Sequence, residues 1–193
     1  MKFEKLKIEG SWLASSKVHS DNRGHFIEWF KFDEITETTN IKFEVRQANS
    51  SFSNKGVLRG IHYSLAKIGQ SKWVTCAAGS VLDFVVDIRP DSPTYKSYDC
   101  NKLMAGDGKA ILIGAGLGHA FLSLEDGSVV SYLLSSSYSP SEEFEINPMD
   151  PELNIDWQKN LISKIEMVMS SKDAKAPSIA ERLEQNQLPY LFK

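Results

Sequence analysis

Short segments of alternating apolar and polar residues, separated by glycine turns, occupy most of the sequence. In the clearest of them, at 81–89, Leu82, Phe84, Val86 and Ile88 fall on one face of a strand. Almost no helical pattern lies between this segment and the ones that follow it. The short strands that follow it are expected at 95–103, 109–113, 120–124 and 129–134. Their near-regular spacing indicates an antiparallel sandwich or barrel.

The rest of the chain adds more strands and little helix. Strands are expected at 2–8, 11–20, 25–30, 43–51, 56–64 and 72–78. One or two helical turns are expected at 31–39, and the best helix pattern, at 177–185, begins with Pro177. A length of 193 residues favours one domain with an arm or a tail.

The charge balance narrows the class of partners. The formal net charge is −3 and there is no basic block, which argues against a protein that binds nucleic acid. A small anionic ligand needs only a few well-placed cations, so it stays possible. No apolar run approaches the ~20 residues that span a bilayer, and no membrane partner is expected.

The two cysteines, Cys76 and Cys100, lie in strand-like segments without CxxC or His-rich spacing. A metal site built from cysteines is therefore not expected. Two free thiols suit a reducing compartment. The charged N-terminal segment lacks the apolar core of a signal peptide, so we expect a cytoplasmic protein.

One apolar strand, GVLRGIHYS at 56–64, carries two polar residues, Arg59 and His62. Burying such groups costs free energy unless they are hydrogen-bonded. A histidine on an apolar strand is more often a hydrogen-bonded core residue than a catalytic one. The segment therefore indicates a site only if the rest of the chain supplies partners for it.

Other segments also carry polar side chains whose role the pattern leaves open. Gln47 and Asn49 share one face of a strand, which is either a polar lining or an exposed edge. Lys72 stands beside apolar neighbours, as a snorkelling surface lysine does. Asp83 falls on a half-apolar face, where a carboxylate requires a cationic or hydrogen-bonding partner. Arg23 lies in a polar turn, where a solvated cation is the ordinary interpretation.

Six motifs occur along the chain in the order GVLRGIHY, QSKWV, GSVLDFVVDIRPDSPTY, GLGHAF, SYLLSSSYSP and SKDAKAP. Together they resemble the motifs of the dTDP-4-dehydrorhamnose 3,5-epimerase family, which includes epimerases of antibiotic deoxysugar pathways. The resemblance covers about 23–177. It implies an all-β, cupin-type antiparallel jelly-roll barrel with a short helical C-terminal tail. It also implies a single epimerase domain, 1–193, with strands at 1–50 that exchange in a homodimer, a barrel core at 51–140 and a tail at 141–193 that contributes Asp173.

The resemblance further implies the reaction, which is epimerisation of a nucleotide-linked 4-keto-6-deoxyhexose without a metal or organic cofactor. Thymidine diphosphate is the expected nucleotide. Inversion beside a ketone needs a base that removes a carbon-bound proton, a group that holds the enolate oxygen, and an acid on the opposite face. His62 matches the family base and Asp173 the carboxylate that orients it. Lys72 matches the lysine near the ketone, and Tyr132 matches the proton donor.

The remaining family positions concern binding. Arg23 and Arg59 match residues that hold the diphosphate, which replaces the interpretation of Arg23 as a loop cation. Tyr138 matches an aromatic residue that stacks on the base, with Phe26 as a candidate for its second face. Gln47, Asn49, Glu28, Glu143 and Lys172 match nucleotide-contacting positions, and Asp83 and His119 match an inner pair that hydrogen-bonds near the sugar.

The sequence departs from the common family pattern at two places. Before His119 it has GAGLG at 114–118 where the family has a proline and a glutamate, and after Tyr132 it has Leu133 where the family has lysine. These versions look more like the antibiotic-sugar branch, in which some members invert only one centre. The resemblance thus implies the reaction class more firmly than the number of centres. The changed loop is expected to bear on which C–H lies against His62.

Two other functions are compatible with a cupin barrel. A metal-dependent cupin enzyme requires closely spaced histidines on one strand, and the sequence contains no HxH, so no metal site is expected. A non-catalytic sugar-binding module has no need for an acid and a base on opposite faces of its ligand. The joint presence of His62, Lys72, Tyr132 and Asp173 therefore argues against it.

The spacing of Arg59 and His62 creates a geometric problem. Residues three apart on a regular strand point to opposite faces, yet both are expected to reach one pocket. We therefore predict a bulge or a strong twist at or beside Gly60 that re-aims one of them.

Overall fold

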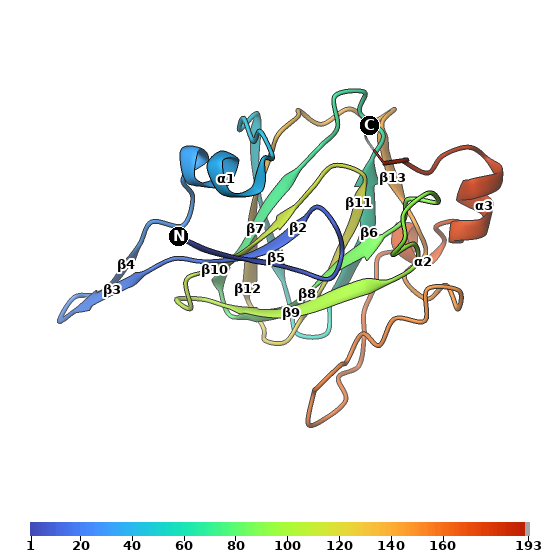
Figure 1. The fold of residues 1–193 in the computed structure, drawn as a ribbon. Coiled ribbons are helices and arrows are strands. Elements are labelled where there is room, and N and C mark those ends of the chain that lie inside the picture. Colours follow the sequence, from blue (N-terminus) through green and yellow to red (C-terminus); the bar gives the residue numbers. More distant parts are fainter. Residues whose placement is uncertain (192–193) are drawn as a thin grey trace.

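The computed structural model describes residues 1–191 and shows two antiparallel β-sheets packed into a jelly-roll barrel (Figure 1). The expected all-β jelly roll is confirmed. The six-stranded sheet has the order β1 (Lys2–Lys5), β2 (Ser11–Ser15), β10 (Lys109–Ile113), β7 (Lys72–Ala78), β12 (Ser128–Leu134), β5 (Gln47–Ser53). The five-stranded sheet has the order β13 (Glu143–Glu145), β6 (Leu58–Ser64), β11 (Leu117–Ser123), β8 (Ser80–Asp87), β9 (Tyr98–Met104).

An arm and a tail extend from this barrel. Strands β3 (Val18–Asp21) and β4 (Gly24–Ile27) form a two-stranded hairpin that projects away from the body (Figure 1). Helix α1 (Phe32–Thr39) follows the hairpin, and the short helices α2 (Ser171–Ala174) and α3 (Ile179–Glu184) belong to the C-terminal tail. The expected helix near the C-terminus is thus confirmed, with Ser178 as its N-cap.

Strand β8 divides its side chains between two apolar clusters, as its alternation predicts. Val81 and Val85 point into the cluster between the sheets. Phe84 and its alternate neighbours point outward into a second cluster, which the C-terminal tail covers with Trp157 and Ile179. Because a carboxylate on the inner face is surrounded by the barrel, this division places Asp83 inside the molecule, where it is fully buried.

A third apolar cluster lies under α1, on the outer face of the six-stranded sheet. Trp73 is fully buried there, and its indole Nε1 donates a hydrogen bond to the Trp29 carbonyl at 2.9 Å. Phe43 packs into the same cluster. The strand expected at 43–51 therefore begins only at Gln47, and the stretch expected at 11–20 is divided between β2 and β3 where the chain leaves the barrel for the arm.

Candidate active site

Strand β6 contains the predicted irregularity at Gly60. Arg59 pairs with Phe121 of β11, but His62 pairs with His119, so the register shifts between the two pairs. Gly60 has a φ of +121°, and a Cβ atom added there would lie 2.5 Å from the Cβ of Ala120. Only glycine tolerates both conditions without strain. The prediction of a bulge is confirmed.

The bulge brings Arg59 and His62 to the same face of the sheet. Leu58, Ile61 and Tyr63 pack into the outer cluster under the tail. Arg59 and His62 instead line a common cavity of about 450 Å³, whose other wall is formed by the tail segment that carries Asp173. Arg59 is held at its rim by hydrogen bonds from Nε to the Ser53 hydroxyl, at 3.1 Å, and from its guanidinium to the Phe52 carbonyl, at 3.0 Å.

His62 forms a hydrogen-bonded pair with Asp173 from α2. The Nε2 atom of His62 lies 2.8 Å from Oδ1 of Asp173, and the His62 side chain is 44% exposed whereas that of Asp173 is 6% exposed. The Ser170 hydroxyl caps α2 by accepting a hydrogen bond from the Asp173 amide at 3.0 Å. The tail thus delivers a fixed carboxylate to a histidine that still faces a cavity.

The protonation of this pair follows from its contacts. Burial raises the pKa of the Asp173 carboxyl, but hydrogen bonds with His62, Ser170 and the Gly60 backbone more than offset burial, and the pKa is lowered. The carboxylate is therefore ionised at neutral pH and can only accept hydrogen bonds. Nε2 of His62 then carries the proton, and Nδ1 is the ring nitrogen that is free to take up another.

A second cavity, of about 260 Å³, lies beside the first, and His62 and Lys172 line both. Lys72 and Tyr132 also line it, on strands β7 and β12 of the facing sheet. The predicted residues Asn49, Tyr138 and Glu143 line the same cavity. The sequence prediction missed other lining residues, which are Gln70, Leu134, Pro140, Phe144 and Glu145.

Lys72 is a buried cation whose ammonium donates a hydrogen bond to the His62 carbonyl at 3.2 Å. Burial lowers its pKa to about 8, and the negative charges of Glu143 and Asp83 act in the opposite direction. The ammonium is therefore still protonated at pH 7, in a place where little water screens its charge. The interpretation of Lys72 as a snorkelling surface lysine is wrong.

Gln70 is the missed residue with the clearest contacts. Its amide Nε2 donates to Oε1 of Glu143 at 2.9 Å and to the Ser136 hydroxyl at 3.1 Å. These bonds tie the loop after β12 to the segment before Lys72. Gln70 opens the QSKWV motif, and that position was the only sequence signal that pointed to it.

The polar face of β5 lines the barrel rather than forming an exposed edge. Asn49 stands opposite Tyr132, and Gln47 stands opposite Leu134, both of which belong to the inner face of β12. Gln47 donates from Nε2 to Oδ1 of Asn49 at 2.9 Å and accepts from the Tyr138 amide at 2.8 Å. The Tyr138 ring is 60% exposed at the rim.

His119 and Asp83 form a second histidine–carboxylate pair deeper in the barrel. Nε2 of His119 lies 2.7 Å from Oδ2 of Asp83, and the two side chains are 9% and 0% exposed. The other oxygen of Asp83 has no hydrogen-bond partner among residues 1–191. Because His119 stands opposite His62 across the β6–β11 ladder, the two pairs are neighbours.

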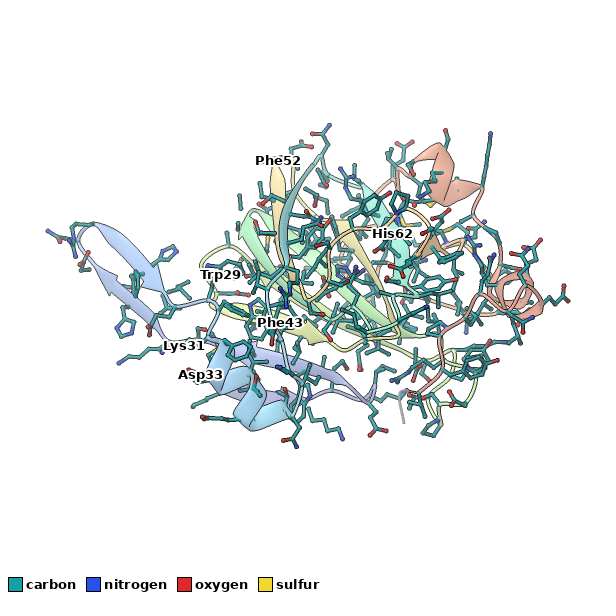
Figure 2. The ribbon with its side chains drawn as sticks, turned by 90° about the horizontal axis from the view of Figure 1, so that it is seen from above. Trp29, Lys31, Asp33, Phe43, Phe52 and His62 are labelled. Carbon is teal, nitrogen blue, oxygen red and sulfur yellow. The ribbon has the colours of Figure 1, made fainter. Side chains whose placement is uncertain are left out.

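The arm residues are not brought to these cavities within the chain. Arg23 is 85% exposed at the hairpin tip and pairs with Asp21, and Phe26 is 64% exposed. Glu28 follows at the base of the arm. Figure 2 shows His62 within the body of the molecule and the hairpin extending away from it. Three of the expected binding residues therefore lie outside the site that their own chain forms.

The two departures from the family pattern also lie outside the cavity walls described above. Leu133 packs into the outer cluster under α1. In the changed loop, the Gly114 amide donates to the Gly10 carbonyl at 2.8 Å, and Gly116 lies against the side chains of Arg89 and Pro189. In the described part of the chain, these contacts do not involve the cavity walls, so they give no direct support to the expected influence of this loop on which C–H lies against His62.

Two further features bear on the class of protein. Among residues 1–191, no group of three or more His, Cys, Asp or Glu side chains is arranged to hold a metal ion. In the same range, no helix combines the length and apolar character needed to cross a membrane.

A jelly-roll barrel that gathers a histidine–carboxylate pair, a buried lysine and a tyrosine around one cavity defines a cupin-type enzyme built for proton transfer. The model of the dTDP-4-dehydrorhamnose 3,5-epimerase family matches residues 5–181. The chain belongs to this family, and it is a carbohydrate epimerase, an isomerase.

Individual relatives support this assignment. The chain is 42% identical over 189 residues to dTDP-4-dehydrorhamnose 3,5-epimerase of Mycolicibacterium smegmatis, with coverage of 98% of this chain and 91% of the relative. The structure of the rmlC epimerase of Mycobacterium tuberculosis matches with a TM-score of 0.93 and 39% identity, over 98% of this chain and 94% of that one. The structure of ChmJ, a 3′-monoepimerase of Streptomyces bikiniensis in complex with dTDP-quinovose, matches with a TM-score of 0.89 and 40% identity, over 96% and 91%.

Proposed function

We propose that the enzyme epimerises a dTDP-linked 4-keto-6-deoxyhexose at the carbons beside the ketone, C3 and C5. One observation carries the proposal: a half-exposed histidine, oriented by a buried carboxylate, shares a cavity with a lysine and a tyrosine. The names of relatives support the substrate class, since they act on dTDP-4-dehydro sugars or were solved with a dTDP-sugar. Inversion at C3 alone is the second candidate, because 3-epimerases are similar to this chain at about the same identity.

The proposed chemistry moves protons only. Nδ1 of His62 removes the carbon-bound proton next to the ketone, and the C–H electron pair forms the enolate. The Lys72 ammonium stabilises the negative charge that develops on the enolate oxygen. Tyr132 returns a proton to the same carbon from the opposite face, which inverts the centre. Solvent then takes the proton from His62 and restores the one that Tyr132 lost, so no cofactor is needed.

Asp173 supports this cycle without exchanging the proton itself. Its ionised carboxylate fixes the ring of His62 and stabilises the imidazolium that forms after abstraction. His119 and Asp83 stand behind the cavity, where we expect them to hydrogen-bond near the sugar. The proposal therefore assigns a transfer role to the exposed pair and a binding role to the buried pair.

Binding of the nucleotide is proposed to use the rim of the site. Arg59 and Lys172 are cations at the two cavities, which suits a diphosphate. Gln47, Asn49 and Glu143 are proposed to contact the nucleotide, and the exposed ring of Tyr138 is available to stack on its base.

We also propose a homodimer in which the arm of one protomer reaches the site of its partner. Arg23, Phe26 and Glu28 would then meet the diphosphate and the base there. Their distance from the cavities of their own chain, together with the exposure of Arg23 and Phe26, supports this arrangement. The free cysteines Cys76 and Cys100 support a reducing cytoplasm as the location.

Proton NMR in heavy water tests the proposed reaction. Wild-type enzyme is incubated with dTDP-4-keto-6-deoxyglucose, and the H3 and H5 signals are followed. We expect solvent deuterium to replace one or both protons, and the pattern of loss reports which centres are activated. dTDP-glucose is the matched control, because without the ketone its C–H protons are not acidic. Retention of both protons of the keto sugar would contradict the proposal.

A further inference from the structure

Glu145, the last residue of β13, connects the active site to the C-terminal helix. Its Oε2 lies 3.0 Å from the ammonium of Lys172, and its Oε1 lies 3.8 Å from the guanidinium of Arg182. Its backbone carbonyl accepts a hydrogen bond from Nε of Arg182 at 2.9 Å. Glu145 also stands opposite His62 in the strand ladder. One carboxylate thus joins an arginine of α3 to a lysine at the mouth of the site.

The Arg182 end of this chain of contacts is rigid. Arg182 is 8% exposed, and its guanidinium lies over the ring of Phe144 at 5.2 Å from the centroid. Its other terminal nitrogen donates to Oε1 of Gln187, and the backbone carbonyl of Gln187 accepts a hydrogen bond from the Tyr63 hydroxyl at 2.7 Å. Because these contacts leave the guanidinium little freedom, Arg182 holds Glu145 in one orientation.

The Lys172 end is free by comparison. The Lys172 side chain is 70% exposed and lines both cavities around His62. Its hydrogen bond with Glu145 raises the pKa of the ammonium, so the charge is retained at neutral pH. A lysine of this length has high rotamer entropy in water. The Glu145 carboxylate restricts that freedom and directs the ammonium to the cavity that the residue lines.

We propose that Arg182 and Glu145 are positioning residues that hold the Lys172 ammonium over the site and thereby raise its affinity for the nucleotide diphosphate. This inference rests on the proposed function for the identity of the ligand. A carboxylate alone would repel an anion. Because Arg182 neutralises Glu145 from behind, the three groups together present a net positive charge to the diphosphate.

A double-mutant cycle read on dTDP binding tests the inference. Arg182→Met and Lys172→Met are each expected to weaken dTDP binding about tenfold, and the double variant is also expected to lose only about tenfold, because Arg182 acts through Lys172. Arg182→Lys should recover part of the loss. Lys175→Met removes an exposed lysine from the same segment and should leave the Kd unchanged. In steady-state assays of Arg182→Met and of Lys172→Met, the KM should rise while kcat stays within about twofold.

The opposite outcomes are distinct. A double variant that loses about a hundredfold, or an Arg182→Met variant that binds dTDP as the wild type does, would overturn the inference. A purely structural role would reduce the folded fraction and leave the Kd of the folded protein unchanged. Should Arg182→Met fail to fold, Glu145→Gln interrupts the same connection with little change of shape. Deuterium exchange by the wild type tests the proposed reaction separately, because dTDP binding needs no turnover.

Discussion

The two histidine–aspartate pairs of this enzyme have nearly the same geometry and very different surroundings. Their N–O distances are 2.8 Å for His62–Asp173 and 2.7 Å for His119–Asp83, and the two histidines stand opposite each other on β6 and β11. The His62 side chain is 44% exposed and that of His119 only 9%. Because only His62 has an exposed side chain beside a cavity, we expect the two pairs to have different functions.

The pairs also differ in what holds the carboxylate. The Asp173 carboxylate is hydrogen-bonded to His62, and the pKa of that carboxyl is lowered despite burial, by His62 first and then by Ser170 and the Gly60 backbone. Asp83 is fully buried, and one of its oxygens lacks a partner among the described residues. A well-satisfied carboxylate at the edge of a cavity suits a proton-transfer site. A fully buried pair is instead expected to contribute to stability as well as to its proposed binding role near the sugar, since losing one partner leaves the other without its hydrogen bond.

Replacing each histidine in turn gives the largest expected contrast. His62→Asn should lower the rate of solvent deuterium incorporation about 10³-fold, within the range for loss of a general base. His119→Asn, the matched control, should lower it by no more than about tenfold, because His119 does not remove the proton. NMR of the keto sugar in heavy water measures both rates. Equal losses in the two variants would remove the functional distinction between the pairs.

Replacing each aspartate should affect turnover and stability differently: one variant should lose mainly turnover and the other mainly stability. Asp173→Asn is expected to reduce turnover about 10²-fold, because the amide no longer stabilises the imidazolium, while the free energy of unfolding falls by only about 1 kcal/mol. Asp83→Asn should reduce that free energy by about 3 kcal/mol, because His119 loses its hydrogen-bonded carboxylate partner in a fully buried place. Urea denaturation measures the free energy of unfolding of both variants, and steady-state kinetics measures their turnover. A larger stability loss for Asp173→Asn than for Asp83→Asn would break the comparison.

The sequence predicted the barrel and the division of its best strand into two faces well. The alternation of β8 is local information, so it placed Asp83 and Phe84 on opposite faces of the strand without reference to any partner, but it did not say which face is the inner one. The bulge at Gly60 followed from requiring Arg59 and His62 to share one pocket. The first prediction needed only short-range geometry, whereas the second also needed the shared pocket that the family resemblance implies.

The connection between the tail and the barrel could not be predicted in the same way. Asp173 meets His62 across 111 residues, and only the family resemblance pointed to it. Nothing in the sequence paired Glu145 with Arg182, because the pattern of a short strand or helix does not reveal its partner in another element. Their positions depend on how Trp157 and Ile179 seat the tail on the outer cluster, which is a long-range packing effect.

The smallest expected effect concerns Lys72, whose ammonium is hydrogen-bonded to the His62 carbonyl. Burial lowers the pKa of Lys72 to about 8, whereas Asp83 and Glu143 raise it. Because the charged ammonium stabilises the enolate, kcat should fall as the pH rises through about 8.

Asp83→Asn removes one of the two opposing charges, so the pKa of Lys72 falls further and the basic limb of the pH profile moves to lower pH. Asp173→Asn is the matched control and should leave that limb in place. Profiles of kcat from about pH 6 to about pH 10, with circular dichroism to verify folding, measure the shift. An unchanged limb in Asp83→Asn would mean that the buried pair does not act on Lys72, and its role would then be limited to stability.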